Sequence, residues 1–200
     1  DIKEKILYHL EDPSSTDFFS DFANFGLKNH LDARRTLKNP QHHIPEIVSL
    51  VDHKLKNIVE GIYQSHFKLV GIQVYRNKYY QAEEINPAEG VKMQDIEILS
   101  TNLHFDNEPV SFFRCLIYFS DNIDKHNGAT RIINKKLSKK IARFGYLNRR
   151  RIFYPAKKWI GEQDNLNYFE GHTGDAILFH SPKCLHSATP LATGKERDAV

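Results

Sequence analysis

Two histidines and one aspartate have the residue types and the spacing of a metal site. His104 and Asp106 are separated only by Phe105, and His186 lies far downstream. On a strand, side chains two residues apart point to the same side, so His104 and Asp106 can reach one metal while Phe105 packs behind them. Two histidines and one carboxylate on one face of a metal are the ligands of non-haem Fe(II) oxygenases. We therefore expect these three residues to bind a metal.

The surrounding sequence predicts strands, which matters because a His-x-Asp triplet alone is common by chance. Residues 96–103 and the aromatic, β-branched run 111–119 predict strands on either side of the first pair. Gly174-Asp175 predicts a turn before a short buried strand at 176–179, and residues 184–187 predict the next strand. All three ligand positions are therefore expected at strand ends.

Taken in their order along the chain, these motifs resemble those of the phytanoyl-CoA dioxygenase family of Fe(II)- and 2-oxoglutarate-dependent oxygenases. The resemblance covers roughly residues 67–200 and rests on His104-x-Asp106, YFSDNIDKHNGATRII at 118–133 and GDAILFHSPKCLHSATPLATGKERDAV at 174–200. The chain departs from the family at 132–136, where Pro-Gly-Ser-His is often found. The resemblance implies Fe(II), 2-oxoglutarate as cosubstrate and O2 as cofactors, and hydroxylation as the reaction.

The resemblance also implies how the cosubstrate is held. In the family an arginine eleven residues after the second histidine binds the far carboxylate of 2-oxoglutarate, and here that residue is Arg197. A planar guanidinium suits this role because it donates paired hydrogen bonds to a carboxylate. Lys195 is the rival, since related prolyl hydroxylases use a lysine at a similar distance. By analogy, Gln73 and Asn77 on an expected strand at 67–78 line the cosubstrate pocket.

Other histidines compete with His186 for the metal. His180 is the strongest rival because it lies only six residues earlier, but no arginine follows it at the family's distance. The remaining candidates have helical or loop contexts and are expected to be ordinary helix or surface residues: His42, His43, His53, His66 and His172.

Composition and periodicity predict one α+β domain over residues 1–200 with a mainly β core. Residues 1–66 are expected to be helical, with capping residues at 14–17 before Phe18, Phe19 and Phe22. From Pro45 onward, apolar residues from Ile47 to Ile62 recur at helical spacing and predict core-facing helices. Residues 67–200 are expected to form the double-stranded β-helix, or jelly-roll, that the resemblance to these oxygenases implies, with the N-terminal helices packed on it.

Location is predicted from what the sequence lacks. It has no run of 18 or more apolar residues and no secretory leader, so we expect no membrane span. Cys115 and Cys184 both fall in expected core strands, which favours free thiols in a reducing compartment such as the cytoplasm.

A basic insert lies between the two halves of the metal site. Residues 135–161 contain ten lysines or arginines and no acidic residue, although the net charge of the whole chain is only +3. This placement predicts a basic wall or lid that selects a small anionic organic substrate rather than nucleic acid, and the alternative is that the insert is a solvated surface segment. Two alternatives remain: an oxygenase acting on protein or nucleic acid, and a catalytically silent jelly-roll binding protein. The sequence leaves the oligomeric state open.

Overall fold

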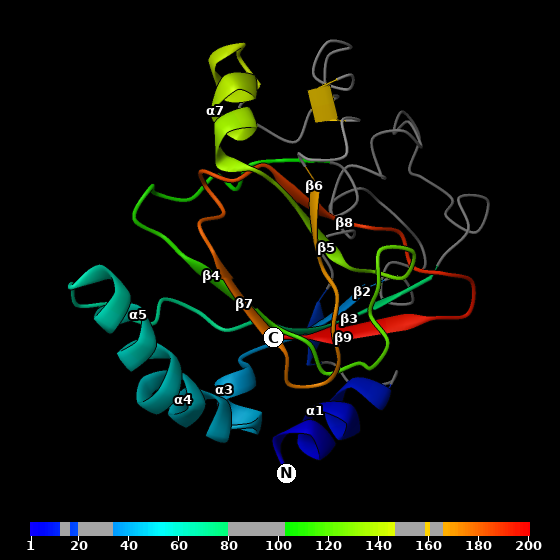
Figure 1. Cartoon of the computed structure of the whole chain (residues 1–200). Coiled ribbons are helices and arrows are strands. Elements are labelled where there is room, and N and C mark those ends of the chain that lie inside the picture. The colour runs from blue at the N-terminus through cyan, green and yellow to red at the C-terminus, as the bar shows by residue number, and fades with distance from the viewer. Residues whose placement is uncertain (13–16, 20–33, 80–102, 147–158, 161–165) are drawn as a thin grey trace.

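The computed structural model describes residues 1–12, 17–19, 34–79, 103–146, 159–160 and 166–200, and Figure 1 shows how they are arranged. The helices are α1 (Ile2–Glu11), α3 (Pro40–His43), α4 (Glu46–Leu50), the π-helical turn η2 (Val51–Leu55), α5 (Lys56–Tyr63) and α7 (Lys135–Arg143). The strands are β1 (Phe18–Phe19), β2 (Arg34–Leu37), β3 (Val74–Lys78), β4 (Arg114–Ile117), β5 (Thr130–Ile133), β6 (Leu166–Phe169), β7 (Ala176–Phe179), β8 (His186–Ala188) and β9 (Glu196–Ala199).

The strands form antiparallel sheets that bring distant parts of the chain together. One sheet has the order β1-β2-β3-β9, a second pairs β4 with β7, and a third has the order β6-β5-β8. β4 also continues the first sheet, because Ile117 and Val200 exchange backbone hydrogen bonds of 2.9 and 3.0 Å. The protein is therefore a mixed helix and sheet structure whose pairings are antiparallel.

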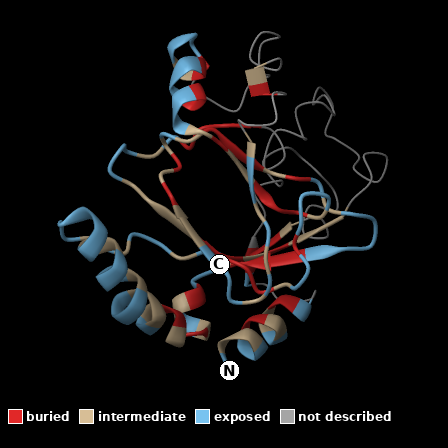
Figure 2. Cartoon of the chain, viewed as in Figure 1, coloured by how far each residue is buried: buried red, intermediate tan, exposed pale blue. Residues whose placement is uncertain are grey.

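Helices cover the sheets in two places (Figure 1). α1, α3 and α4 pack on the outer face of the first sheet, where the core contains Ile6, Ile47, Val74 and Ile117. α7 lies at the opposite end and contributes Leu137 and Ile141 to a second core cluster. Figure 2 shows buried residues along β8 and most of β9, mainly intermediate or exposed residues in β4, β6 and β7, and exposed residues on the outer side of the helices.

The N-terminal part departs from the expected helices at two places. Phe18 and Phe19 form β1 instead of a helix, because they pair with Leu37 and Thr36 of β2. The apolar periodicity after Pro45 does form helices, but only its first part faces the core: Ile47 is buried, whereas Ile58 is 55% and Ile62 63% exposed. The capping residues 14–16, Phe22 and most of the expected strand at 96–103 lie outside the described residues.

The strand expected at 67–78 is shorter than predicted. β3 begins only at Val74, and residues 67–73 pair with no strand among the described residues. The strands predicted at 176–179 and within 111–119 are confirmed as β7 and β4. No described helix has the length and apolar character needed to cross a membrane.

Candidate metal centre

His104 and His186 are brought together by backbone pairing. The two residues form an antiparallel bridge in which each backbone N–H donates to the other's carbonyl, at 2.9 and 3.0 Å. Residues directly opposite each other in an antiparallel pair project to the same face, so their imidazoles lie side by side. The ring centroids are 4.5 Å apart. The two residues, 82 positions apart in the sequence, therefore present adjacent rings.

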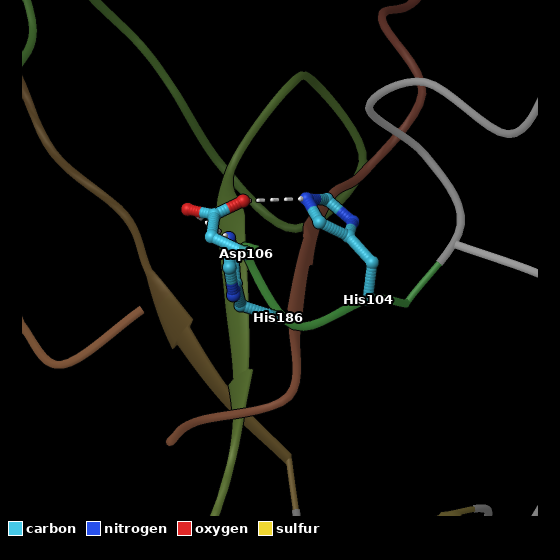
Figure 3. Close-up of side chains that lie close together, drawn as sticks. All are labelled: His104, Asp106 and His186. Carbon is cyan, nitrogen blue, oxygen red and sulfur yellow. Dashed lines mark ion pairs between the residues drawn. The ribbon is translucent and has the colours of Figure 1, made fainter. Parts of the chain in front are cut away.

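Asp106 completes the group. Its Oδ1 lies 3.5 Å from His104 Nε2 and its Oδ2 lies 3.7 Å from His186 Nε2. All three side chains are buried, and one ligand atom from each lies within 4.8 Å of the others. Figure 3 shows the three side chains pointing toward one another. Two imidazole nitrogens and one carboxylate oxygen are donors suited to a divalent iron, so the residues fit the metal that the sequence predicts.

His186 is prepared to bind through Nε2. Its Nδ1 lies 2.9 Å from the carbonyl oxygen of Cys184. Because a carbonyl only accepts, Nδ1 carries the proton and Nε2 keeps its lone pair for a metal. Burial, assisted by the charge of His104, lowers the pKa of His186 to about 4. The ring is therefore neutral near pH 7.

Arg114 supports the ionised form of the Asp106 carboxyl. Its Nη2 lies 3.0 Å from Asp106 Oδ2 and 2.8 Å from Glu108 Oε1. Burial by itself raises the pKa of Asp106, but the interaction with His104 and the charge of Arg114 outweigh burial and hold that pKa well below its usual range. The Asp106 carboxyl is therefore ionised near pH 7.

α7 anchors the residues that immediately precede both histidines. The Tyr146 hydroxyl, just after the helix, donates to the carbonyl of Leu103. The hydroxyl of Ser138, which is fully buried, accepts from the backbone N–H of Leu185 at 3.1 Å. Phe105 packs in the same cluster as α7, as expected for the residue between His104 and Asp106. The helix thus fixes the backbone on both sides of the site.

Arg197 is a buried guanidinium at the predicted position. It is 4% exposed, and its Nη1 donates to the carbonyl of Gly128 at 2.5 Å. Its Nε has no hydrogen-bond partner and no carboxylate pairs with it within the described part of the chain. Lys195, the rival, is exposed. A buried cation is costly unless an anion balances it, so this side chain is suited to receive an anionic ligand.

The two other predicted cosubstrate residues are placed differently. Asn77 in β3 lies directly opposite Arg197 in β9, so the two side chains share one face of the sheet. Tyr75 is on that face as well, with its ring centroid 5.9 Å from the Arg197 guanidinium carbon. Gln73 precedes β3, is exposed and lines a groove described below.

His180 belongs to a different environment. Its ring stacks on Phe113 at a centroid distance of 4.5 Å, and its Nε2 contacts the carbonyl of Val110. It is not in the metal-ligating group found among the described residues. The two cysteines are free, and the pKa of each thiol is raised by burial.

Sequence reasoning missed Arg114 and Glu108. Arg114 is the one charged residue in the run 111–119, and it was included in the expected core strand. A charge inside an apolar strand is a signal for a polar partner, because an unpaired buried charge is unfavourable. Glu108, two residues after Asp106, carried no such signal.

A groove of about 1260 Å³ opens beside this site. Arg114 and Glu108 lie at its wall, together with Lys135 at the start of α7. Much of the remaining lining is apolar or aromatic and comes from α5, the segment 65–72, β4 and the residues just before β4, including Val59, Tyr63, Phe67, Leu69, Phe113 and Leu116. The groove therefore combines an apolar wall with a few charges.

The chain resembles several solved structures, including one with 2-oxoglutarate bound and one described as a non-haem α-ketoglutarate-dependent carbocyclase. HygX from Streptomyces hygroscopicus, solved with nickel and 2-oxoglutarate bound, is 14% identical with a TM-score of 0.55, covering 98% of this chain and 76% of HygX. The carbocyclase SnoK from nogalamycin biosynthesis is 15% identical with a TM-score of 0.56, and the match covers 98% of this chain and 68% of SnoK. AviO1 from Streptomyces viridochromogenes Tue57 is 14% identical with a TM-score of 0.52, and the match covers 100% of this chain and 81% of AviO1. At these identities the likeness establishes the fold.

The sequence comparisons identify the family. No curated protein matches the chain. The family model described as "Phytanoyl-CoA dioxygenase (PhyH)" matches residues 1–199, which is almost the entire chain. The family uses Fe(II), 2-oxoglutarate and O2. This protein therefore belongs to the phytanoyl-CoA dioxygenase family of Fe(II)- and 2-oxoglutarate-dependent oxygenases.

Proposed function

We propose that this protein is an Fe(II)- and 2-oxoglutarate-dependent dioxygenase that hydroxylates a small, anionic organic molecule. The observation that carries the proposal is the buried group of His104, Asp106 and His186 in a chain that matches the family over residues 1–199. We further propose that the antiparallel sheets form the double-stranded β-helix of this superfamily, within one domain whose helical part is residues 1–66.

The residues have distinct roles in this proposal. His104, Asp106 and His186 hold Fe(II), and Arg197 binds the far carboxylate of 2-oxoglutarate. Asn77 shares the sheet face of Arg197 and adds a polar side chain to the same pocket. Gln73 is proposed to reach the cosubstrate from the groove side. When bound, Fe(II) and 2-oxoglutarate supply the chemistry that activates O2 against a C–H bond.

The protein contributes binding, orientation and exclusion of water. The three ligand residues are 5 to 9% exposed and Arg197 is 4% exposed, so both ends of the cosubstrate would lie in a dry environment. Burial strengthens the electrostatic contacts made by these residues and limits side reactions with water. Tyr118, the residue after β4, contacts Thr130 of β5 through its hydroxyl group and has no role at the metal in this proposal.

The groove is the proposed substrate site. Its apolar wall suits the hydrocarbon part of a small organic molecule, and Lys135 lies where the basic insert reaches the groove. The other described cations of the insert, Lys136, Lys139, Lys140 and Arg143, line a separate hollow on α7. Arg149, Arg150, Arg151, Lys157 and Lys158 lie outside the described residues.

Hydroxylation is tested by following the oxygen atoms. The neighbours include a carbocyclase and an epimerase, so 2-oxoglutarate consumption alone does not establish hydroxylation. Candidate substrates, first sought by mass spectrometry of small molecules that copurify, should be incubated with the iron-loaded protein under ¹⁸O₂. Hydroxylation predicts one labelled oxygen in the product, together with succinate. A product of unchanged oxygen content would point instead to desaturation, cyclisation or epimerisation.

The same assay separates the alternatives. Turnover of peptides or oligonucleotides, with no turnover of small acids, would identify a macromolecular substrate. Iron-loaded protein that forms no succinate, with or without candidate substrates, would support a binding protein without catalysis.

A further inference from the structure

Arg114 joins the buried carboxylate of the metal centre to the open groove. One guanidinium nitrogen, Nη2, lies 3.0 Å from Asp106 Oδ2 and 2.8 Å from Glu108 Oε1. The Asp106 side chain is 6% exposed, whereas that of Arg114 is 39% exposed. The arginine therefore contacts a metal ligand from the solvent side, and its effect must act through Asp106.

The position of Arg114 is fixed by its neighbours. In the β4–β7 pairing it lies opposite Phe179, whose ring makes a T-shaped contact with His186 at a centroid distance of 5.0 Å. Glu108, its second partner, accepts a hydrogen bond of 3.3 Å from the Ser181 hydroxyl. The Ser181 carbonyl in turn accepts from the backbone N–H of Asp106 at 3.4 Å. Ser181, Glu108, Arg114 and Asp106 thus form a closed set of polar contacts.

The two oxygens of Asp106 have different surroundings. Oδ1 lies 3.5 Å from His104 Nε2, whereas Oδ2 lies 3.7 Å from His186 Nε2 and, closer, 3.0 Å from Arg114 Nη2. A carboxylate can bind a metal through one or both oxygens. If both were bound, the second oxygen would take a position that a chelating 2-oxoglutarate and O2 need, because a facial triad functions by leaving the opposite positions open.

We propose that Arg114 is a positioning residue that holds Asp106 Oδ2 and leaves only Oδ1 for the metal, so that the positions for 2-oxoglutarate and O2 stay open. Glu108 balances the charge of Arg114, so the arginine can stay close to a divalent cation without a net repulsion. The inference rests on the proposed function, since it assumes that His104, Asp106 and His186 hold a metal.

The proposal makes an unusual prediction about metal and cosubstrate. Removing the guanidinium frees Oδ2 and also removes a positive charge near the metal. Metal affinity should therefore be retained or increased, while 2-oxoglutarate affinity falls. A purely structural role predicts the opposite pattern, with metal affinity and thermal stability lost together. A role in binding the primary substrate predicts that neither metal nor 2-oxoglutarate binding changes.

The test compares Arg114→Gln and Arg114→Lys with the native protein under anaerobic conditions. Mn(II) binding and 2-oxoglutarate binding to the Mn(II)-loaded protein are measured by calorimetry, and Co(II) absorption spectra report the coordination of the metal. Arg114→Gln should keep Mn(II) binding, bind 2-oxoglutarate about tenfold more weakly, in the range typical of outer partners of metal ligands, and shift the Co(II) bands. Arg114→Lys should be intermediate, because a lysine can still pair with one carboxylate oxygen.

Lys183→Gln is the matched control, because it removes a cation that lines the same groove and has no ion pair with Asp106 among the described residues. It should leave both affinities and the Co(II) spectrum unchanged.

Two results would overturn the proposal. One is an Arg114→Gln protein with native 2-oxoglutarate affinity and native Co(II) bands. The other is loss of Mn(II) binding together with a lowered melting temperature. If Arg114→Gln does not fold, native behaviour of Arg114→Lys in both the calorimetry and the Co(II) spectrum counts against the proposal. Failure of the native protein to bind Mn(II) and 2-oxoglutarate would instead reject the proposed function.

Discussion

Arg197 and Gly128, 69 residues apart, are joined by a hydrogen bond from the guanidinium Nη1 to the glycine carbonyl at 2.5 Å. The sequence presents them as separate motifs, the Asn127-Gly128 turn and the arginine after the second histidine. Their contact shows that the turn supports the arginine directly. The glycine also suits a backbone with a φ of +77°, and a Cβ there would lie 2.8 Å from Leu191 Cδ2 and 3.4 Å from Arg197 Cδ.

Replacement of Arg197 should weaken cosubstrate binding selectively. Loss of a buried, charge-assisted partner costs on the order of 2 to 5 kcal/mol, so Arg197→Ala should raise the apparent constant for 2-oxoglutarate by at least about tenfold. Mn(II) affinity should change little, because the arginine does not contact the three ligands. The measurement is a 2-oxoglutarate titration of the Mn(II)-loaded protein. Lys195→Ala is the control, and an effect confined to Lys195→Ala would show that the lysine is the anchor.

A methyl group at position 128 should disturb the same pocket. Gly128 has φ +77°, a conformation that costs an L-residue about 1 to 2 kcal/mol. Gly128→Ala should therefore lower the free energy of unfolding and, through the contact with Arg197, weaken 2-oxoglutarate binding. Gly194→Ala is the matched control because Gly194 has a similar φ of +72° with nothing within 4 Å of the added Cβ. Chemical denaturation and cosubstrate titration of both variants give the comparison.

The two glycine variants should separate strain from contact. Both should be destabilised by the backbone conformation, but only Gly128→Ala should bind 2-oxoglutarate more weakly. Equal cosubstrate affinities in the two variants would show that the turn does not position Arg197.

Ser138→Ala should weaken the support that α7 gives to His186. The hydroxyl accepts from Leu185 N–H and donates to the Ile133 carbonyl, both at 3.1 Å. Leaving these buried groups unpaired costs about 1 to 3 kcal/mol, more than the few tenths that alanine gains in a helix. Unfolding free energy and Mn(II) affinity should both fall. Ser49→Ala, at an exposed position of α4, should change neither. A Ser138→Ala protein with native Mn(II) affinity would remove α7 from the account of the site.

The grouping of His104, Asp106 and His186 could be predicted in part from the sequence. The i, i+2 spacing of His104 and Asp106 predicts that the two side chains lie on the same side of an extended segment, and the distance to Arg197 favours His186 over His180. The backbone pairing of His104 with His186 brings the three side chains together. The contact of Arg114 with Asp106 could not be predicted from local spacing, since it depends on how β4 packs against the segment after His104. That packing is a tertiary contact, and local sequence does not specify it.

The difference between local signals and tertiary contacts also explains which strands and helices could be predicted. β7 is a short apolar run after a turn, and its sequence alone predicts it. Phe18 and Phe19 also form a strand, but through pairing with β2, which lies beyond a stretch outside the described residues. Tertiary pairing overrides local capping signals in such short segments. The exposure of Ile58 and Ile62 shows a related limit, because helical periodicity predicts which face is apolar and not what covers it.

The central claim is that His104, Asp106 and His186 hold the iron to which 2-oxoglutarate binds. The most direct measurement is anaerobic addition of Fe(II) and then 2-oxoglutarate to the native, His186→Ala and His180→Ala proteins, with bound iron and visible absorption recorded. The native and His180→Ala proteins should bind Fe(II) stoichiometrically and develop a charge-transfer band when 2-oxoglutarate is added. His186→Ala should do neither. Normal iron content and a normal band in His186→Ala, with both lost in His180→Ala, would contradict the account.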